Sequence, residues 1–287
     1  MQQLQKYNIV ITGGGSGIGA ALAEKLGEQG HSVIICGRRK KKLQDVVGAK
    51  ANISMFQCDV SSEKEVLALS RFIKKRHKYI DVLINNAGLF GAIGRFDRTN
   101  SSSWKKTFDI NTFGTYLVSK HLLPLLLKSS VKKIINFSGG GAFNSFPNYS
   151  AYAVSKAAVV RLSETIAEEL VDEGVQVNCI APGFVATEIH DATLNESKEV
   201  AGDHYDLTRE KLEKGSVPLE VVVNCVKFLI SDKADELTGK TISASFDKWG
   251  SDQFQNSIDL INNSDLYTMR RINLVNLDLK NPLRKTL

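Results

Sequence analysis

The sequence has few prolines, 5 in 287 residues, and no proline-rich linker, low-complexity stretch or internal repeat that would divide it into several units. It also lacks any run of the roughly 20 apolar residues that a membrane-spanning helix needs. The opening residues, MQQLQKYNIVITGG, contain no apolar core of the kind found in signal peptides. We therefore expect a soluble protein that stays in the cytoplasm.

Cysteine and histidine are scarce and isolated. No CxxC or HExxH spacing occurs, and the cysteines lie mostly within or at the ends of apolar runs. This pattern favours buried free thiols in a reducing compartment over disulfides, and it supplies no ligand set for a metal. We predict no metal centre. The four cysteines are Cys36, Cys58, Cys179 and Cys225.

Charge is moderate, with a formal net charge of +6, and the densest basic cluster is RRKKK at 38–42. Such a cluster is compatible with a nucleic-acid patch, but it is more typical of the solvated start of a helix. We expect no nucleic-acid partner. The composition, 43% hydrophobic and 24% charged, is that of an ordinary globular protein long enough to bury a substantial core.

Strand-like and helix-like segments alternate along most of the chain. This order predicts an α/β fold with a doubly wound, Rossmann-type parallel sheet of about seven strands and helices on both faces. The expected strands are 8–12, 32–36, 54–58, 80–84, 133–137, 175–180 and 241–245, and the longest expected helices are 103–129 and 150–172.

Two segments fall outside this alternation. The polar stretch at about 187–217 is too long for an ordinary connection, so we interpret it as a substrate lid. Beyond Trp249 the alternation weakens. We therefore predict a main domain over 1–248 and a C-terminal extension over 249–287. The extension has too many apolar residues for a solvated tail, so it should pack on the domain or on a partner subunit near the substrate mouth, where Arg270 and Arg271 could approach an anionic substrate.

Two glycine triplets, at 13–15 and 139–141, could each let the backbone approach a ligand closely. The first, in TGGGSGIG at 12–19, follows an expected strand and opens an expected helix. In that setting a glycine loop binds the pyrophosphate of a dinucleotide against the N–H groups of the helix. Gly13, Gly17 and Gly19 are its key positions.

The end of the second expected strand bears on the choice of dinucleotide. NAD sites usually place an acidic residue there to bind the ribose 2′-hydroxyl, but this chain has Gly37 followed by Arg38. A guanidinium suits a 2′-phosphate. The sequence therefore predicts NADP(H) as the cofactor, with Arg38 as a ligand of its phosphate.

Tyr152 and Lys156 are four residues apart on an expected helix and so share one face. A phenol titrates near pH 10 and exchanges protons poorly at neutrality unless a nearby cation stabilises its phenolate. Tyrosine with lysine at this spacing is therefore a plausible acid/base unit.

Taken together, these motifs resemble those of the short-chain dehydrogenase/reductase family, in the family's order and spacing over about residues 7–245. The matching stretches are TGGGSGIG (12–19), CDV (58–60), NNAG (85–88), DINTFGT (109–115), YAVSK (152–156) and APGFVAT (181–187).

The resemblance implies a role for each matched residue. Tyr152 would be the general acid in carbonyl reduction, Lys156 would bind the nicotinamide ribose and lower the pKa of Tyr152, and Asn111 would anchor a proton-relay water. The implied cofactor-binding residues, beside Arg38, are Gly13, Ser16, Gly17, Ile18, Gly19, Asp59, Val60, Asn85, Ala87, Gly88, Tyr152, Lys156, Pro182, Gly183 and Thr187.

One position departs from the family pattern. The catalytic serine expected thirteen residues before Tyr152 is replaced by Gly139, and Ser138 precedes it. Either Ser138 or a loop N–H replaces the missing hydrogen bond, as backbone donors do in oxyanion holes, or the site has lost part of its chemistry. We favour replacement and count Ser138 among the catalytic residues.

The resulting hypothesis is an NADP(H)-dependent oxidoreductase that transfers a hydride between the nicotinamide and a carbonyl or secondary alcohol. The mixed charge of the lid favours a small polar substrate, and the chain bears a faint likeness to reductases of sugar metabolism. The alternative is an NADPH-binding sensor or scaffold without turnover. The family usually associates through its two long central helices, so a homodimer or homotetramer is expected.

Overall fold

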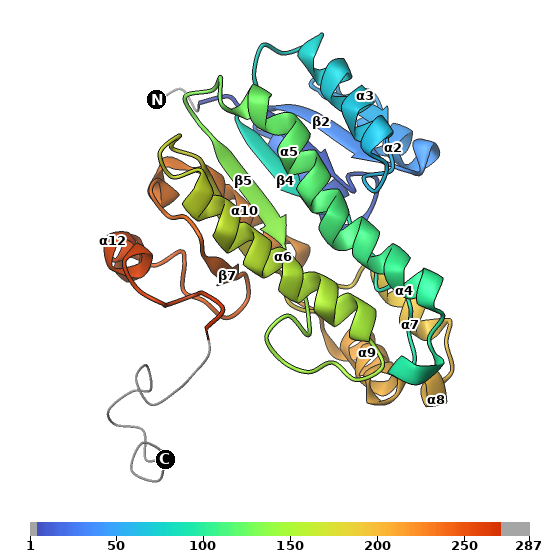
Figure 1. Cartoon of the computed structure of the whole chain (residues 1–287). Helices are drawn as coiled ribbons and strands as arrows, with labels where there is room; N and C mark the ends of the chain where they lie inside the picture. Colours follow the sequence, from blue (N-terminus) through green and yellow to red (C-terminus); the bar gives the residue numbers. More distant parts are fainter. Residues whose placement is uncertain (1–4, 271–287) are drawn as a thin grey trace, which may run out of the picture.

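A parallel sheet forms the centre of the molecule in the computed structural model, which describes residues 5–270 (Figure 1). Within that range seven strands pair in the order β3-β2-β1-β4-β5-β6-β7. This confirms the predicted doubly wound sheet. The strands are β1 Asn8–Thr12, β2 Ser32–Gly37, β3 Ile53–Gln57, β4 Val82–Asn85, β5 Lys133–Phe137, β6 Gln176–Ala181 and β7 Thr241–Ser243.

Strand order reverses between β1 and β4, because the chain crosses from β3 back to the other side of β1. In open parallel sheets a crevice for ligands forms at such a point, beyond the carboxyl ends of the strands. The fold therefore directs attention to the loops after β1, β2, β4 and β5.

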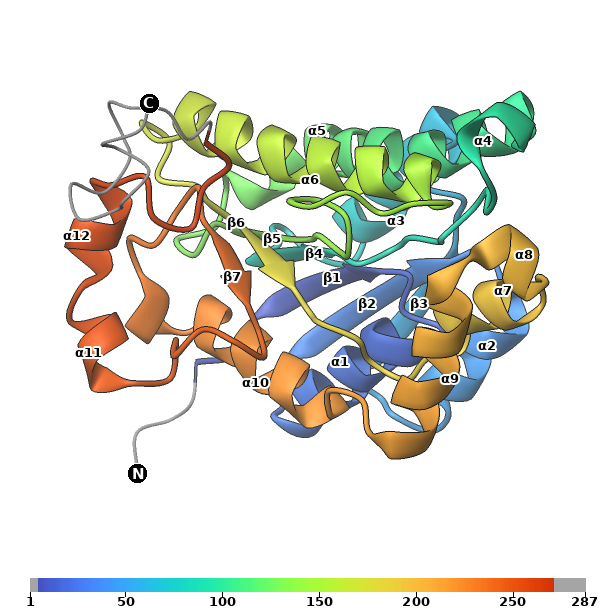
Figure 2. The same cartoon turned by 90° about the horizontal axis from the view of Figure 1, so that it is seen from below.

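Helices cover both faces of the sheet, as Figure 2 shows. One face is packed by α1 (Gly17–Glu28), α2 (Lys40–Val47) and α10 (Leu219–Ile230). The other is packed by α3 (Glu63–Lys74), α5 (Gly114–Leu126) and α6 (Ser150–Glu169). The strands bury alternate Val, Ile and Leu side chains into two separate cores, as expected of strands covered on both sides. None of the helices described is long and apolar enough to cross a membrane.

The helix expected over 103–129 is interrupted. It begins as α4 (Ser101–Phe108), passes through a π-helical turn over Asp109–Phe113, and continues as α5. Such turns insert one extra residue and often lie at functional sites. Here the turn contains Asn111, one of the predicted catalytic residues.

The polar segment at 187–217 is mostly helical. It contains α7 (Asp191–Leu194), α8 (Lys198–Ala201) and α9 (Asp203–Lys214), which lie together beside the carboxyl ends of the strands (Figure 2). Tyr149 anchors this lid, because its hydroxyl lies 2.9 Å from the Thr193 hydroxyl of α7. The polar segment is therefore mostly helical and is joined to the N-terminus of α6 through Tyr149.

The C-terminal extension packs on the main domain as far as it is described. It forms α11 (Asp252–Gln255) and α12 (Ile258–Asn262), and it buries Phe254, Ile258 and Ile261 in the core shared with α1 and α10. Residues 271–287 of the predicted extension, including Arg271, lie outside the described part of the chain.

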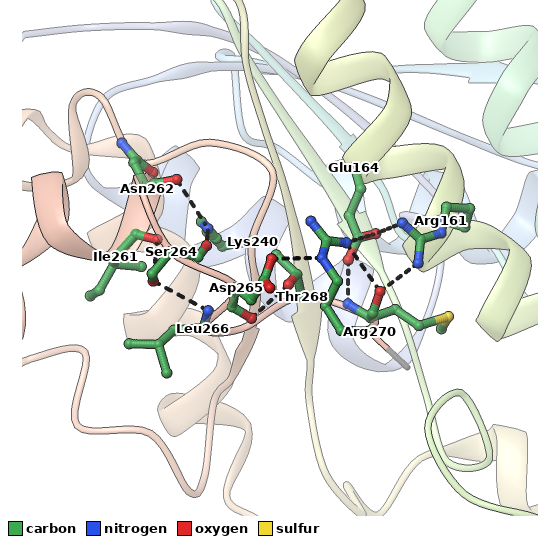
Figure 3. A network of polar contacts seen from close by, with 11 residues as sticks. Arg161, Glu164, Lys240, Ile261, Asn262, Ser264, Asp265, Leu266, Thr268 and Arg270 are labelled. Atoms are coloured by element: carbon green, nitrogen blue, oxygen red, sulfur yellow. Dashed lines mark hydrogen bonds and ion pairs between the residues drawn. The ribbon is translucent and has the colours of Figure 1, made fainter. Parts of the chain in front are cut away.

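After α12 the extension runs along the edge of β7. The Thr241 amide donates a hydrogen bond to the Tyr267 carbonyl at 2.7 Å, and the Met269 amide donates to Glu164 Oε1 of α6 at 2.6 Å. Arg270 bonds Asp265 at 2.7 Å and approaches the Glu164 carboxylate (Figure 3). Arg270 is thus paired within the extension and α6, whereas the sequence had led us to expect it near an anionic substrate.

Candidate active site

A cavity of about 990 Å³ lies at the carboxyl ends of the strands. Its walls come from the β1–α1 loop, the ends of β2, β4, β5 and β6, the start of α6, and the lid. The predicted site residues that line it are Gly13, Ser16, Gly17, Ile18, Arg38, Asp59, Val60, Ala87, Gly88, Ser138, Tyr152, Lys156, Pro182, Gly183 and Thr187.

Three predicted site residues do not line the cavity. Gly19 packs against the Gly13 carbonyl and Asn86, where a Cβ would not fit. Asn85 is buried and donates to Ser119 Oγ and Asn136 Oδ1, both at 2.9 Å. Gly19 and Asn85 therefore support the backbone and strands around the cavity. The neighbouring Asn86 lines the cavity instead.

Asn111 is the third predicted site residue that does not line the cavity. Its Nδ2 donates to the Leu89 carbonyl and to Ser155 Oγ, and its Oδ1 accepts from the Leu89 amide, all at 2.9 Å. It is fully buried in the π-helical turn and ties that turn to β4 and α6. Gly88 separates it from the cavity, and a Cβ at Gly88 would lie 3.3 Å from both Asn111 Oδ1 and Lys156 Nζ.

The first glycine loop has the geometry needed to approach a phosphate. Gly17 has φ +54°, in the left-handed region that favours glycine, and starts α1 immediately after Ser16. Asn86 Nδ2 braces the loop by donating to the carbonyls of Thr12 and Gly13 at 3.0 and 3.2 Å. The N-terminus of α1 therefore opens on the cavity with its backbone donors held in place.

Tyr152 and Lys156 lie on the first turns of α6, and both side chains are buried. Lys156 Nζ donates to the Phe137 carbonyl at 2.8 Å and lies 5.8 Å from the centroid of the Tyr152 ring. Burial lowers the pKa of Lys156 to about 8. That bond uses one of the three ammonium donors, so others remain for a ligand in the cavity.

Burial raises the pKa of Tyr152 above its ordinary value. This direction is opposite to the one that the resemblance implies, because loss of hydration disfavours the phenolate. The buried phenol is therefore protonated at neutral pH but is a weaker acid than an ordinary phenol, and it gives up its proton only where positive charge, such as that of the Lys156 ammonium, stabilises the phenolate.

The second glycine triplet lies directly against Tyr152. A Cβ at Gly139 would overlap the Tyr152 hydroxyl, and one at Gly141, where φ is +82°, would lie 2.8 Å from Ala153 and Phe146. The phenol thus occupies the space that a side chain at 139 would fill. Glycine at this position accommodates the tyrosine.

Ser138, at the end of β5, is buried, and its Oγ has no hydrogen-bond partner within residues 5–270. Its amide is committed to the Ile180 carbonyl at 2.9 Å. A buried hydroxyl without a partner is costly, and such groups are usually satisfied by a water or a ligand. Ser138 therefore has a free hydroxyl beside the cavity.

Basic side chains gather at the opposite end of the cavity, where the sequence predicts a phosphate-binding role for the first one or two residues of the RRKKK cluster. Arg38 lines the cavity, but Arg39 also does so, and its Nη2 donates to Ser16 Oγ at 2.6 Å. Lys42 joins Arg39 on the carboxylate of Glu188. In the sequence, these basic residues are marked only by the RRKKK cluster as a whole. Lys42 was expected to be a solvated charge at the start of a helix.

Aromatic rings surround the reacting end. Phe90 packs edge-on against Tyr152 with ring centroids 4.7 Å apart, and Phe184 stacks on His190 at 3.9 Å. His204 packs against Phe146 at 4.7 Å. These residues come from four distant segments, so no single sequence motif marked them.

The two histidines of this wall are neutral at pH 7, because burial lowers both pKa values, that of His204 to about 4. His190 Nε2 lies 3.0 Å from the Val185 carbonyl. Its Nδ1, and Nε2 of His204, have no hydrogen-bond partner in the part of the chain that the structure describes.

These features fit a dinucleotide lying along the cavity. A glycine loop and the N-terminus of α1 lie beside a basic cluster at one end, and a buried ammonium and phenol lie at the other. The free donors of Lys156 and the unpartnered Ser138 hydroxyl indicate a polar ligand at that end.

Comparison with known proteins agrees with this geometry. The family model for short chain dehydrogenase matches residues 7–198, about two thirds of the chain. The chain belongs to the short-chain dehydrogenase family.

Relatives and solved structures extend the match. An uncharacterized oxidoreductase of Staphylococcus aureus strain MRSA252 is 32% identical over 217 residues, covering 75% of this chain and 93% of the relative. The 3-oxoacyl-[acyl-carrier-protein] reductase of S. aureus strain Mu50 is 30% identical over 238 residues, covering 81% and 94%.

Among solved structures, levodione reductase superposes with a TM-score of 0.74 at 25% identity, covering 83% of this chain and 95% of that one. A short-chain dehydrogenase of Escherichia coli CFT073 complexed with NADPH also gives 0.74, at 26% identity, covering 85% and 99%. The protein is an NAD(P)-dependent short-chain oxidoreductase acting on CH–OH or C=O groups.

Proposed function

We propose that this oxidoreductase uses NADP(H) to interconvert a carbonyl and a secondary alcohol, with Tyr152 as the proton donor in reduction. The observation that carries the proposal is geometric: the buried Tyr152 phenol and Lys156 ammonium share the first turns of α6 at one end of a cavity whose other end is basic. The bound nicotinamide supplies or accepts the hydride.

The residues around Tyr152 support its role. Lys156 offers donors for the nicotinamide ribose and places positive charge near the phenol as its proton leaves. Asn111 anchors the proton relay indirectly, by fixing the π-helical turn against Leu89 and Ser155. The carbonyl oxygen receives its second hydrogen bond from the 138–141 loop, through Ser138 Oγ or a loop N–H.

The alternative, a sensor that binds NADPH without turnover, rested on the missing serine. In this structure Gly139 fits a Tyr152 ring that lies against the 139–141 loop, and Ser138 or a loop N–H is available to supply the hydrogen bond in place of the missing serine. We therefore favour the enzyme.

We expect NADPH to bind about 10- to 150-fold more tightly than NADH, because charge-assisted hydrogen bonds contribute about 1.5–3 kcal/mol. From the contacts of the two arginines, we expect Arg39 to contribute more than Arg38 to the preference for NADPH. Arg39 contacts Ser16, whereas the Arg38 side chain forms no hydrogen bond within the described residues. Arg39→Ala should therefore remove most of the preference, and Arg38→Ala less of it.

Dissociation constants of both nucleotides, measured by fluorescence titration, test this expectation. Equal constants for NADPH and NADH in the parent protein would contradict it. A larger loss of NADPH preference in Arg38→Ala than in Arg39→Ala would mean that Arg38 is the main ligand of the 2′-phosphate, as the sequence alone predicts.

The aromatic side chains that line the cavity restrict the class of substrate that we propose. The lid composition favoured a small polar compound, possibly sugar-derived, but Phe90, Phe146 and Phe184 offer apolar surface to a ring. The unpartnered nitrogens of His190 and His204 can satisfy few polar groups. Each unpaired buried hydroxyl is costly, so we propose a compact ring carbonyl with one or two further polar groups, in place of a fully hydroxylated sugar.

We propose that the protein is located in the cytoplasm. The four cysteines are free and buried, as predicted, which suits a reducing cytoplasm. Within the basic cluster, Arg39 and Lys42 are engaged with Glu188, so we assign those residues to the cofactor end and propose no nucleic-acid partner.

A further inference from the structure

The lid brings an acidic side chain to the basic end of the cleft. Glu188 Oε2 accepts from Arg39 Nη1 at 2.8 Å, and Glu188 Oε1 accepts from Lys42 Nζ at 2.6 Å. Glu188 and Arg39 are 149 positions apart in the sequence. One carboxylate therefore bridges two cations of α2 and its N-terminal flank.

The bridge lies beside the glycine loop that opens α1. Arg39 also donates to Ser16 Oγ, which makes no capping bond to α1 and is free to face the cleft. Thr187, the preceding residue of the lid, lies over the glycine loop, since a Cβ at Gly17 would be 3.1 Å from its methyl group. Glu188 is thus held beside the loop in the position where an anionic group of the cofactor would meet Arg39.

The ion pairs of Glu188 with Arg39 and Lys42 form in this structure, but a more highly charged anion can replace the Glu188 carboxylate in them. Hydrogen bonds from Lys42 and Arg39 lower the pKa of Glu188, so it is anionic at neutral pH. The three side chains are 41–58% exposed, and ion pairs exposed to this degree contribute little net stability. A phosphate, which carries more charge and more acceptor oxygens, can displace the carboxylate.

We propose that Glu188 determines which adenine nucleotide the cleft prefers. Its carboxylate occupies the anion position beside Arg39 and Lys42, so a ribose 2′-phosphate must displace it, whereas a 2′-hydroxyl can donate a hydrogen bond to it. Glu188 thereby supplies from the lid the acid that the end of β2 lacks at Gly37. The inference rests on the proposed binding of NADP(H) in this cleft.

The test uses two ligands that lack nicotinamide, so it does not depend on turnover. Adenosine 2′,5′-bisphosphate carries the 2′-phosphate, and 5′-AMP carries the 2′-hydroxyl. In calorimetric titrations of the full chain, Glu188→Gln should bind the bisphosphate about tenfold more tightly than the parent protein does. The same variant should bind 5′-AMP about threefold more weakly, because an acceptor for its 2′-hydroxyl is lost.

A matched control removes the same charge elsewhere in the lid. Glu199 is exposed on α8 and forms no ion pair with Arg39 or Lys42 among the described residues. Glu199→Gln should leave both affinities within about twofold of the parent values. In an Arg39→Ala background, Glu188→Gln should lose most of its effect, because the two residues act on the same phosphate.

The outcomes separate this inference from the proposed function. A parent protein that prefers the bisphosphate, with no change in Glu188→Gln, overturns the role of Glu188 and leaves NADP(H) binding intact. A parent without preference, together with a Glu188→Gln variant that gains one, supports the role of Glu188 as the competing group. If neither protein prefers the bisphosphate, both proposals fail.

Discussion

At the residue scale, the second hydrogen bond to the substrate is the point on which the chemistry depends. The 138–141 loop offers two kinds of donor, the unpartnered Ser138 hydroxyl and the N–H groups of Gly139 and Gly140. Loss of a donor to a developing oxyanion typically lowers kcat by about 10²–10³. Two substitutions distinguish the donors.

If Ser138 donates, Ser138→Ala should lower kcat by about that factor and leave the NADPH dissociation constant unchanged. If a loop N–H donates, Ser138→Ala should be nearly silent. Under both accounts Gly139→Ala should force the Tyr152 ring to move, because its methyl group overlaps the Tyr152 hydroxyl, and turnover should fall if the ring must lie where this structure has it. Steady-state kinetics with NADPH titrations make the comparison, and a fully active Gly139→Ala would show that the Tyr152 position is misassigned.

The residue scale also shows what the sequence could predict. Gly17, Tyr152 and Lys156 were found because their spacing follows from local geometry, one in a strand-to-helix turn and two on one helix face. The bridge from Arg39 to Glu188 was missed because it joins positions 149 apart. Such a contact depends on how the lid folds over the sheet, which no local pattern encodes.

At the element scale, strand positions were predictable because buried parallel strands are continuous apolar runs. The π-helical turn over Asp109–Phe113 was not, because the apolar spacing of 103–129 continues across it. The helices of the lid were also missed. α9 buries little, Thr208 alone among its side chains, so its sequence has no apolar stripe.

The C-terminal extension is an element whose attachment can be measured. Glu164 on α6 is buried, accepts from the Met269 amide, and pairs with Arg161 at 2.6 Å (Figure 3). Glu164→Ala should lower the free energy of unfolding by about 1–3 kcal/mol, because it leaves these donors without their acceptor. Urea denaturation measures the loss.

The matched control is Glu169→Ala, at an exposed position of the same helix, which should change the free energy of unfolding by less than about 0.5 kcal/mol. Equal losses in the two variants would mean that the extension is not held by Glu164. Because Met269 packs against the buried cluster of Ala142, Val159, Val160 and Cys179, and Ala142 directly follows the glycine loop, release of the extension should also raise hydrogen exchange in residues 139–142.

At the scale of the whole molecule, α4, α5 and α6 form one layer over the sheet (Figure 1). Some apolar side chains of this layer are exposed to solvent. Phe113 and Tyr116 stack at 5.7 Å, and both are exposed, as is Val154 of α6. Association of copies through this face would cover these apolar side chains, so we predict a homodimer or homotetramer that buries it.

Tyr116→Glu should shift the protein toward monomer in light scattering after size-exclusion chromatography, because a charge would be buried in the interface. Leu260→Glu, at an exposed position of α12, is the control and should leave the assembly unchanged. A parent protein that is monomeric at micromolar concentration would contradict the predicted assembly.

If this molecule reduces a carbonyl with NADPH, the Tyr152 phenol should supply the proton. The most direct measurement follows NADPH oxidation by absorbance, for the parent and Tyr152→Phe, with ring ketones that carry one further hydroxyl or carbonyl. The account predicts turnover by the parent and a loss of about 10²–10⁴ in kcat for Tyr152→Phe, with NADPH binding retained. Full activity in Tyr152→Phe, or a parent that binds NADPH and oxidises none with any carbonyl, would contradict it.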